Sequence, residues 1–245
     1  MTKTTYWEQN PVNLNNEAKR LPVLFLLDVS PSMNMNNRIN QLNLALKGFI
    51  EDLRKDIQTK VAVEIALVTF STKTEVFQDF LEVGKMRIPE ISALKEGATL
   101  LGQSILFSLE VINTRRLKFK SKNIDFYAPY LVVITDGKPE WEDQKILSRA
   151  IKEVYKAGVS TNADNCILTF PIGVGNDVTV EYLQKLAEGY LDRPIIFDDA
   201  TEFSGLFKVI SKSITDSVKR AHSIDEQKKE TKNAWHEKLI NVRRK

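Results

Sequence analysis

Three polar side chains that follow one apolar stretch could together bind a metal ion. Residues 21–27 are apolar throughout, and Asp28, Ser30 and Ser32 come directly after them. An apolar run of this length is typical of a strand buried on both faces, and ligand sites in open α/β sheets lie at the carboxyl ends of such strands. Mg²⁺ prefers about six oxygen ligands and gives up water reluctantly, so hydroxyls and water-bridged carboxylates suit it. The Asp-x-Ser-x-Ser pattern is therefore a candidate cation site.

A second reading of the same pattern needs no metal. Asp and Ser at the end of a strand also suit the capping of the helix that follows. Taken alone, Asp-x-Ser-x-Ser fits a cap and a metal site equally well. A further carboxylate is nevertheless available, because Asp136 follows a second apolar run at residues 130–135 and precedes Gly-Lys-Pro.

Four segments, in the same order along the chain, resemble the von Willebrand factor type A domain. They are Leu-Leu-Asp-Val-Ser-Pro-Ser-Met at 26–33, Gly-Ala-Thr at 97–99, Val-Ile-Thr-Asp-Gly at 133–137 and Ile-Gly-Val-Gly-Asn-Asp-Val at 172–178. The resemblance covers about residues 20 to 220 and implies an intact metal-ion-dependent adhesion site, usually holding Mg²⁺, with Mn²⁺ or Ca²⁺ as alternatives. In such sites two serines and a threonine coordinate the cation and two aspartates act largely through bound waters; the matching residues here are Asp28, Ser30, Ser32, Thr99 and Asp136.

Two positions depart from the family pattern. Pro31 stands where glycine is frequent, which fixes that backbone angle and biases Ser30 towards an extended conformation. Glu96 precedes Gly97 where a second glycine is usual, and it adds a negative charge. Because Thr99 and Asp136 both stand where the resemblance places them, we predict a metal site rather than a cap.

The apolar segments predict an α/β fold in which strands alternate with helices. Short apolar runs predict strands at 21–28, 61–70, 74–81, 130–135, 166–174 and 194–197. Helical spacing predicts helices at 37–56, from 101 onward, and at 142–157, 181–188 and 202–218. This order indicates a Rossmann-like, doubly wound, mostly parallel six-stranded sheet with helices on both faces, in which 74–81 is an antiparallel edge strand.

Three shorter segments carry expectations based on local composition. Residues 84–94 are expected to form a loop with a short helix, and Gly158 is expected to end the helix before it. The five basic residues between Arg115 and Lys122 indicate a solvated helix end.

The expected organisation is one domain with an appendage at each end. Residues 1–20 form an N-terminal extension with Trp7 as its candidate anchor, residues 21–220 the type A domain, and residues 221–245 a basic tail that we expect to be helical. In the tail, Trp235, Leu239 and Val242 share one helical face. That face either packs on its own domain or docks a partner, and the sequence leaves both possibilities open.

Composition argues against several classes of protein. The 245 residues are 42% hydrophobic and 27% charged, which is ordinary for a globular domain. No apolar run approaches the roughly 18 residues that span a bilayer, and residues 1–20 are too polar for a signal peptide. The net charge of +3 arises in the tail, without the aromatic residues that would favour nucleic-acid binding. The single cysteine, Cys166, lies in an apolar run, so we expect a cytoplasmic protein that binds neither membrane nor nucleic acid.

Enzymatic interpretations find little support in the residues. A phosphoryl-transfer enzyme of the haloacid dehalogenase type needs a second carboxylate two residues after its aspartate, and here that position is Ser30. Both histidines, His222 and His236, lie in the tail, which leaves a Ser-His-Asp triad without a base. We therefore predict a non-enzymatic, metal-dependent protein-interaction module that binds an acidic residue of a partner, with a Mg²⁺-dependent phosphoryl hydrolase as the alternative.

The sequence Arg-Leu-Pro-Val at the start of the first strand and the compact size of the chain resemble the bacterial TerY-like branch of the family. This resemblance implies a cytoplasmic regulatory or scaffold component of a tellurium-resistance or stress-response system. It also implies partners such as a kinase, phosphatase or ATPase encoded nearby. Contacts around the metal that could set specificity are expected at Asn34 to Arg38, Leu100, Lys138 to Trp141 and Asn176 to Asp177.

Overall fold

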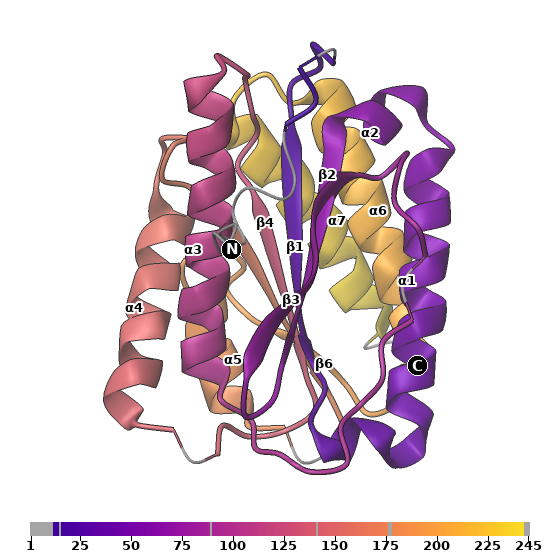
Figure 1. The fold of residues 1–245 in the computed structure, drawn as a ribbon, viewed down its shortest axis with the longest axis vertical. Helices are drawn as coiled ribbons and strands as arrows, with labels where there is room; N and C mark the ends of the chain where they lie inside the picture. Colours follow the sequence, from indigo (N-terminus) through magenta and orange to yellow (C-terminus); the bar gives the residue numbers. More distant parts are fainter. Residues whose placement is uncertain (1–11, 15, 89, 141, 176–177, 243–245) are drawn as a thin grey trace, which may run out of the picture.

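The computed structural model describes residues 12–14, 16–88, 90–140, 142–175 and 178–242. These residues form one six-stranded sheet with helices on both faces (Figure 1). The strand order is β3-β2-β1-β4-β5-β6, and every neighbouring pair is parallel except β2 and β3. The predicted fold class, including its antiparallel edge strand, is confirmed. The strands are β1 (Leu21–Asp28), β2 (Val63–Phe70), β3 (Thr74–Glu82), β4 (Tyr130–Thr135), β5 (Leu168–Val174) and β6 (Ile195–Phe197).

In the described part of the chain, two sets of three helices cover the sheet. In Figure 1, one face carries α1 (Arg38–Arg54), α6 (Phe203–Arg220) and α7 (Ile224–Val242), and the other carries α3 (Leu101–Ser121), α4 (Gln144–Val159) and α5 (Val180–Ala187). Each set encloses its own apolar core. On the α1 face, for example, Phe25 stacks on Phe207 with ring centroids 5.5 Å apart. The shorter helical segments are η2 (Pro31–Asn37), α2 (Ile57–Ala62) and η3 (Ala200–Glu202).

The central strands β1 and β4 mark the point where the strand order reverses. β1 pairs with β2 on one side and with β4 on the other, so the chain leaves the carboxyl ends of two adjacent strands in opposite directions. The helix after β1 packs on one face of the sheet and the helix after β4 on the other. Such a switch point leaves a crevice at the carboxyl edge of the sheet, where ligands of α/β proteins bind.

Two expectations based on local composition are wrong, and one short helix was not expected. Residues 84–88 and 90–94 form turns and loop with no helix. Gly158 lies inside α4 and does not end it. A glycine is needed there for close packing, since a Cβ would lie 2.7 Å from the Gly189 oxygen. The short helix α2 was not predicted, since its six residues are too few to show a periodicity.

The basic run at the end of α3 is not wholly solvated. Arg115 and Arg116 are only 4% and 6% exposed. Nε of Arg115 donates to Oε2 of Glu64 at 2.7 Å, and Nη1 of Arg116 donates to the Cys166 carbonyl at 3.2 Å. A run of basic residues favours a solvated surface, but the helical period turns these two residues inward, where each has a hydrogen-bond acceptor.

The C-terminal segment forms a helix that packs on its own domain. Trp235 is fully buried, and its ring centroid lies 5.0 Å from that of Phe170 on β5. The side-chain amide of Gln227 bonds both the N–H and the carbonyl of Ala128, at 3.0 and 2.9 Å. The side chains of Leu239 and Val242, and the anchor expected at Trp7, lie outside the described part of the chain. No helix of the described residues is long and apolar enough to cross a membrane.

Candidate metal centre

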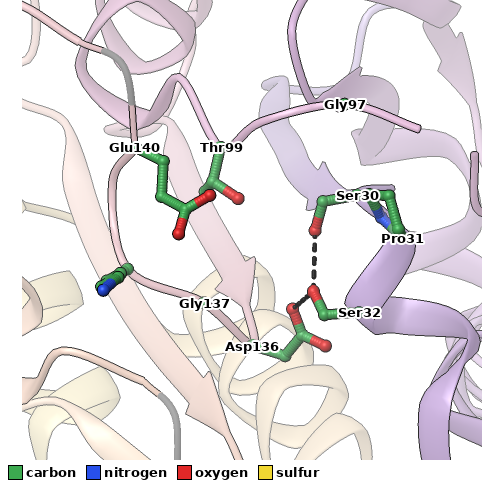
Figure 2. Close-up of a pocket in the computed structure, with 9 residues that line it drawn as sticks. Ser30, Pro31, Ser32, Gly97, Thr99, Asp136, Gly137 and Glu140 are labelled. Atoms are coloured by element: carbon green, nitrogen blue, oxygen red, sulfur yellow. Dashed lines mark hydrogen bonds between the residues drawn. The ribbon is translucent and has the colours of Figure 1, made fainter.

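The five predicted site residues lie at the carboxyl edge of β1 and β4. Asp28 ends β1, and Asp136 directly follows β4; both are fully buried. Ser30 and Ser32 lie where the chain leaves β1 for α1, and Thr99 lies just before α3. Ser30, Ser32, Thr99 and Asp136 line one pocket of about 430 Å³ (Figure 2). The structure therefore brings residues from three distant segments to one place.

Hydroxyls and carboxylates are linked across the pocket floor. The Oγ atoms of Ser30 and Ser32 are 2.9 Å apart, and Ser32 Oγ donates to Oδ1 of Asp136 at 2.7 Å (Figure 2). Asp28 lies behind this row. Its Oδ1 accepts from the Ser30 N–H at 2.8 Å, and its Oδ2 accepts from the Thr135 hydroxyl at 2.6 Å. Two neutral hydroxyls thus face the pocket, supported by two carboxylates.

The backbone around Ser30 adopts the conformation that Pro31 favours. Ser30 has φ −61° and ψ 163°, which is extended, as expected for a residue before proline. Pro31 then begins η2, where its missing N–H is not needed. Proline in place of the frequent glycine at position 31 is therefore compatible with the arrangement in which the Ser30 and Ser32 hydroxyls both face the pocket.

Thr99 is positioned by a loop that requires glycine. Gly97 has φ +148°, and a Cβ there would lie 2.3 Å from the Ser71 Oγ. The loop is held by the Ala98 N–H, which donates to Thr72 Oγ1 at 2.9 Å, and by the Glu140 N–H, which donates to the Thr99 carbonyl at 3.0 Å. In Figure 2, Thr99 lies across the pocket from the two serines.

Burial dominates the electrostatics of Asp28. Loss of water raises the pKa of this carboxyl from 3.8 to about 6, against the opposing hydrogen bonds from Thr135 and Ser30, and the nearby charge of Asp136 adds to the rise. A divalent cation would favour the ionised form and reverse this effect.

Arg38 is the principal residue whose role the sequence did not reveal. We expected it on the rim among partner contacts, but it is 5% exposed, and its Nη1 donates to Oδ2 of Asp136 at 2.6 Å. One signal was present in the sequence. A cation at the start of a helix opposes the positive end of the helix dipole, which suggests a specific anionic partner.

Two glutamates after Asp136 lie near Thr99, but only one of them lines the pocket. The Glu142 carboxylate accepts from the N–H groups of Gly102 and Gln103 at 2.8 and 2.7 Å, and so caps α3 next to Thr99. Glu140 lines the pocket, with its carboxylate directed towards Thr99 in Figure 2. Lys138 also lines it, as expected for the segment after β4, whereas Trp141 and residues 176–177 lie outside the described part of the chain.

Residues 23–209 match the family model of the von Willebrand factor type A domain. The chain belongs to this family. Members of the von Willebrand factor type A family are generally protein-interaction modules rather than enzymes.

Relatives and solved structures agree with this assignment. The inter-alpha-trypsin inhibitor heavy chain H2 of Mesocricetus auratus is 26% identical over 187 residues, which are 72% of this chain and 18% of that protein. A von Willebrand factor type A structure from Catenulispora acidiphila is 19% identical, with a TM-score of 0.57, over 80% of this chain and 43% of that one. Proximal thread matrix protein 1 from the mussel byssus, with a zinc-occupied MIDAS motif, is 18% identical, with a TM-score of 0.54, over 80% of this chain and 46% of that one. The chain thus spans less than a fifth of the inhibitor heavy chain and less than half of either structure, and both structures show the fold alone.

The donor set at the type A pocket fits a hard divalent cation. Three hydroxyls and two carboxylates supply only oxygen, which suits Mg²⁺, Mn²⁺ or Ca²⁺ better than softer metals. In the described part of the chain no group of three or more His, Cys, Asp or Glu side chains gathers as a metal site. A cation in this pocket would therefore need Ser30, Ser32 and Thr99 as well as the aspartates.

Proposed function

We propose that the chain is a metal-dependent protein-interaction module that binds an acidic residue of a partner. The metal is held by Asp28, Ser30, Ser32, Thr99 and Asp136. One observation carries this proposal: the hydrogen-bonded row of Ser30, Ser32 and Asp136, which opens into a pocket at the switch point of the sheet.

The bound metal would supply a Lewis-acidic position for a carboxylate oxygen, and the protein's own side chains explain why a carboxylate suits it. Ser30, Ser32 and Thr99 offer neutral oxygens towards the pocket, whereas Asp28 is fully buried behind them. A cation held mainly by neutral ligands retains attraction for an external anion. Mg²⁺ is the proposed metal, and Mn²⁺ or Ca²⁺ could replace it. The mussel protein with zinc in its MIDAS motif supports metal binding at such a site.

The alternative, a Mg²⁺-dependent phosphoryl hydrolase, fits the geometry poorly. Its nucleophile would be Asp28, but both oxygens of this carboxylate accept hydrogen bonds from inside the protein, from Ser30 and Thr135. The carboxylate is fully buried, so a phosphate ester in the pocket could not reach it. Turnover of p-nitrophenyl phosphate by purified protein with Mg²⁺ would support the hydrolase and contradict our proposal.

The cellular setting is a further part of the proposal. We place the module in the cytoplasm, as a regulatory or scaffold component of a TerY-like stress-response system whose partners include a kinase, phosphatase or ATPase encoded nearby. The support is the Arg-Leu-Pro-Val wording before β1 and the lone, buried Cys166.

Capture of a partner tests the function. Immobilised protein is incubated with cell extract in EDTA, then in excess Mg²⁺, beside a Ser30→Ala/Ser32→Ala variant. The matched control is Ser211→Ala/Ser213→Ala, which removes two hydroxyls at the same spacing from α6. We expect proteins that bind the wild type and the control only with Mg²⁺, and that do not bind the site variant. If the same proteins are captured in EDTA and by the site variant, the partner binds another face of the domain.

A further inference from the structure

Arg38 joins the candidate metal site to the interior of the protein. Its Nη1 lies 2.6 Å from Oδ2 of Asp136, while Oδ1 of the same carboxylate accepts from Ser32 at 2.7 Å. One oxygen of Asp136 therefore faces the pocket hydroxyls, and the other faces the guanidinium of Arg38. Arg38 is 5% exposed and Asp136 is fully buried, so water screens this pair weakly.

The local backbone is built to place this guanidinium. Asn36 and Asn37 have φ values of +49° and +60°, a region that asparagine enters more readily than most residues, and they turn the chain into α1 so that Arg38 is its first residue. At the end of β5, Gly175 has φ +90°, and a Cβ there would lie 2.3 Å from Nη2 of Arg38. The guanidinium thus occupies space that only a glycine leaves.

The charges at the site have a simple consequence. Asp28, Asp136 and Arg38 together carry one net negative charge, and the charges of Lys138 and Glu140 on the pocket lining cancel each other, so a divalent cation leaves the centre with one positive charge. Without Arg38, the two carboxylates would balance the cation. A guanidinium beside the site weakens the attraction for the metal but strengthens the attraction of the loaded centre for an anion.

We propose that Arg38 is a positioning residue and built-in counter-ion that lowers metal affinity and raises the affinity of the loaded centre for a carboxylate. It holds the Asp136 carboxylate oriented before a metal binds, and it leaves surplus positive charge afterwards. The ligand class that it selects is an anionic carboxylate over a neutral carbonyl or hydroxyl. Arg38 has this role only if the site binds a metal as proposed above.

Two substitutions separate charge from packing. Arg38→Gln removes the charge but keeps a hydrogen-bond donor, and Arg38→Lys keeps the charge. Arg149→Gln, on the exposed side of α4, is the matched control.

Mn²⁺ affinity is measured by the loss of the free-ion electron paramagnetic resonance signal, and acetate affinity by the fall in water-proton relaxation of the Mn²⁺-loaded protein. We expect Arg38→Gln to bind Mn²⁺ about tenfold more tightly and acetate about tenfold more weakly. Arg38→Lys should stay within about threefold of the wild type in both.

The opposite signs of the two shifts are the decisive result. A parallel loss of both affinities in Arg38→Gln, or no change in either, would overturn the role of Arg38, because a purely structural residue would produce one of these patterns. If Arg38→Gln does not fold, Arg38→Lys decides: retained affinities support the charge, and a change beyond about threefold overturns it. A wild-type protein that binds no Mn²⁺ would instead contradict the metal site itself.

Discussion

The two ends of the sheet each bury arginines beside carboxylates, but they use these charges differently. At the amino end, Glu64 at the start of β2 lies between Arg115, whose Nε is 2.7 Å away, and Arg20, whose Nε is 3.6 Å away. Arg20 and Glu64 are fully buried. At the carboxyl end, two buried carboxylates, Asp28 and Asp136, lie near one buried arginine, Arg38, which pairs with Asp136.

The difference lies in the charge balance and in what faces solvent. At the amino end, cations surround the carboxylate, and the neighbouring Glu82 accepts from the side-chain amides of Asn13 and Asn16 at 2.8 and 3.0 Å. At the carboxyl end, carboxylates outnumber cations, and hydroxyls line a pocket of about 430 Å³. In the first arrangement the buried charges are paired within the protein, whereas the second leaves negative charge that a cation can balance.

The largest expected effect comes from breaking the amino-end cluster. Glu64→Gln leaves Arg20 and Arg115 buried beside a neutral amide, and loss of one partner of a buried ion pair costs about 3–5 kcal/mol. Urea unfolding should show this loss, while the rise in melting temperature with Mg²⁺ stays as in the wild type. Glu75→Gln on the exposed side of β3 is the control and should change stability by less than about 0.5 kcal/mol. A Mg²⁺ response lost with Glu64 would mean that the two ends are not independent.

Removing either carboxylate at the carboxyl end should abolish the Mg²⁺ response, with opposite effects on the metal-free protein. Asp136→Asn leaves Arg38 buried without its counter-charge and should cost about 2–3 kcal/mol. Asp28→Asn removes a buried charge that pairs with no cation in the described part of the chain, and it keeps the acceptor for the Ser30 N–H, so it should stabilise by about 1–2 kcal/mol. Urea unfolding in EDTA measures both. Equal destabilisation by the two variants would contradict the division of labour between these aspartates.

The smallest effect belongs to an ion pair at the amino end. Asp56 caps α2, accepting from the Thr59 N–H at 2.8 Å, and pairs with Lys219 of α6 at 2.5 Å. Burial acts to raise the pKa of Asp56, but hydrogen bonds from Lys219 and Thr59 outweigh it and bring the pKa from 3.8 to about 2. The folded state therefore favours the ionised form, so the stabilisation is present above pH 3.8 and is lost as the pH falls through about 2. Asp56→Asn should cost about 0.5–1 kcal/mol at pH 7.

The pH profile checks that assignment. Urea unfolding of the wild type and of Asp56→Asn should differ at pH 7 and converge near pH 2. A difference that persists unchanged at pH 2 would mean that the cost of the substitution is not electrostatic.

Much of the fold and of the site arrangement follows from local signals in the sequence. Two apolar runs, one ending in Asp28 and one at Thr135, predict β1 and β4. A strand buried on both faces is apolar along its length, so the first polar residues mark its end. Ser30 and Asp136 could be placed together because the two strands are neighbours in the fold that the motifs predict. Their role as metal ligands stays a prediction.

What the sequence could not show were contacts between distant segments. Arg38 pairs with a residue 98 positions away, and Glu64 pairs with Arg115 51 positions away. The position of Arg38 after the Asp-x-Ser-x-Ser motif predicts a rim contact, and the basic run around Arg115 predicts a solvated helix end; neither local signal shows the buried carboxylate that each arginine meets. The sequence likewise leaves two possible contacts for Trp235, its own domain or a partner, and only the structure shows that it packs on Phe170.

The most direct test of the metal site is the number of Mn²⁺ ions bound per chain. Chelator-treated protein is titrated with Mn²⁺ and followed by electron paramagnetic resonance, and bound Mn²⁺ is then displaced with Mg²⁺. The wild type and Ser211→Ala/Ser213→Ala should each bind one ion that Mg²⁺ displaces, and Ser30→Ala/Ser32→Ala should bind it at least about tenfold more weakly, since two inner oxygens are lost. Equal Mn²⁺ affinity in all three proteins, or no binding by the wild type, would contradict a metal centre at the ends of β1 and β4.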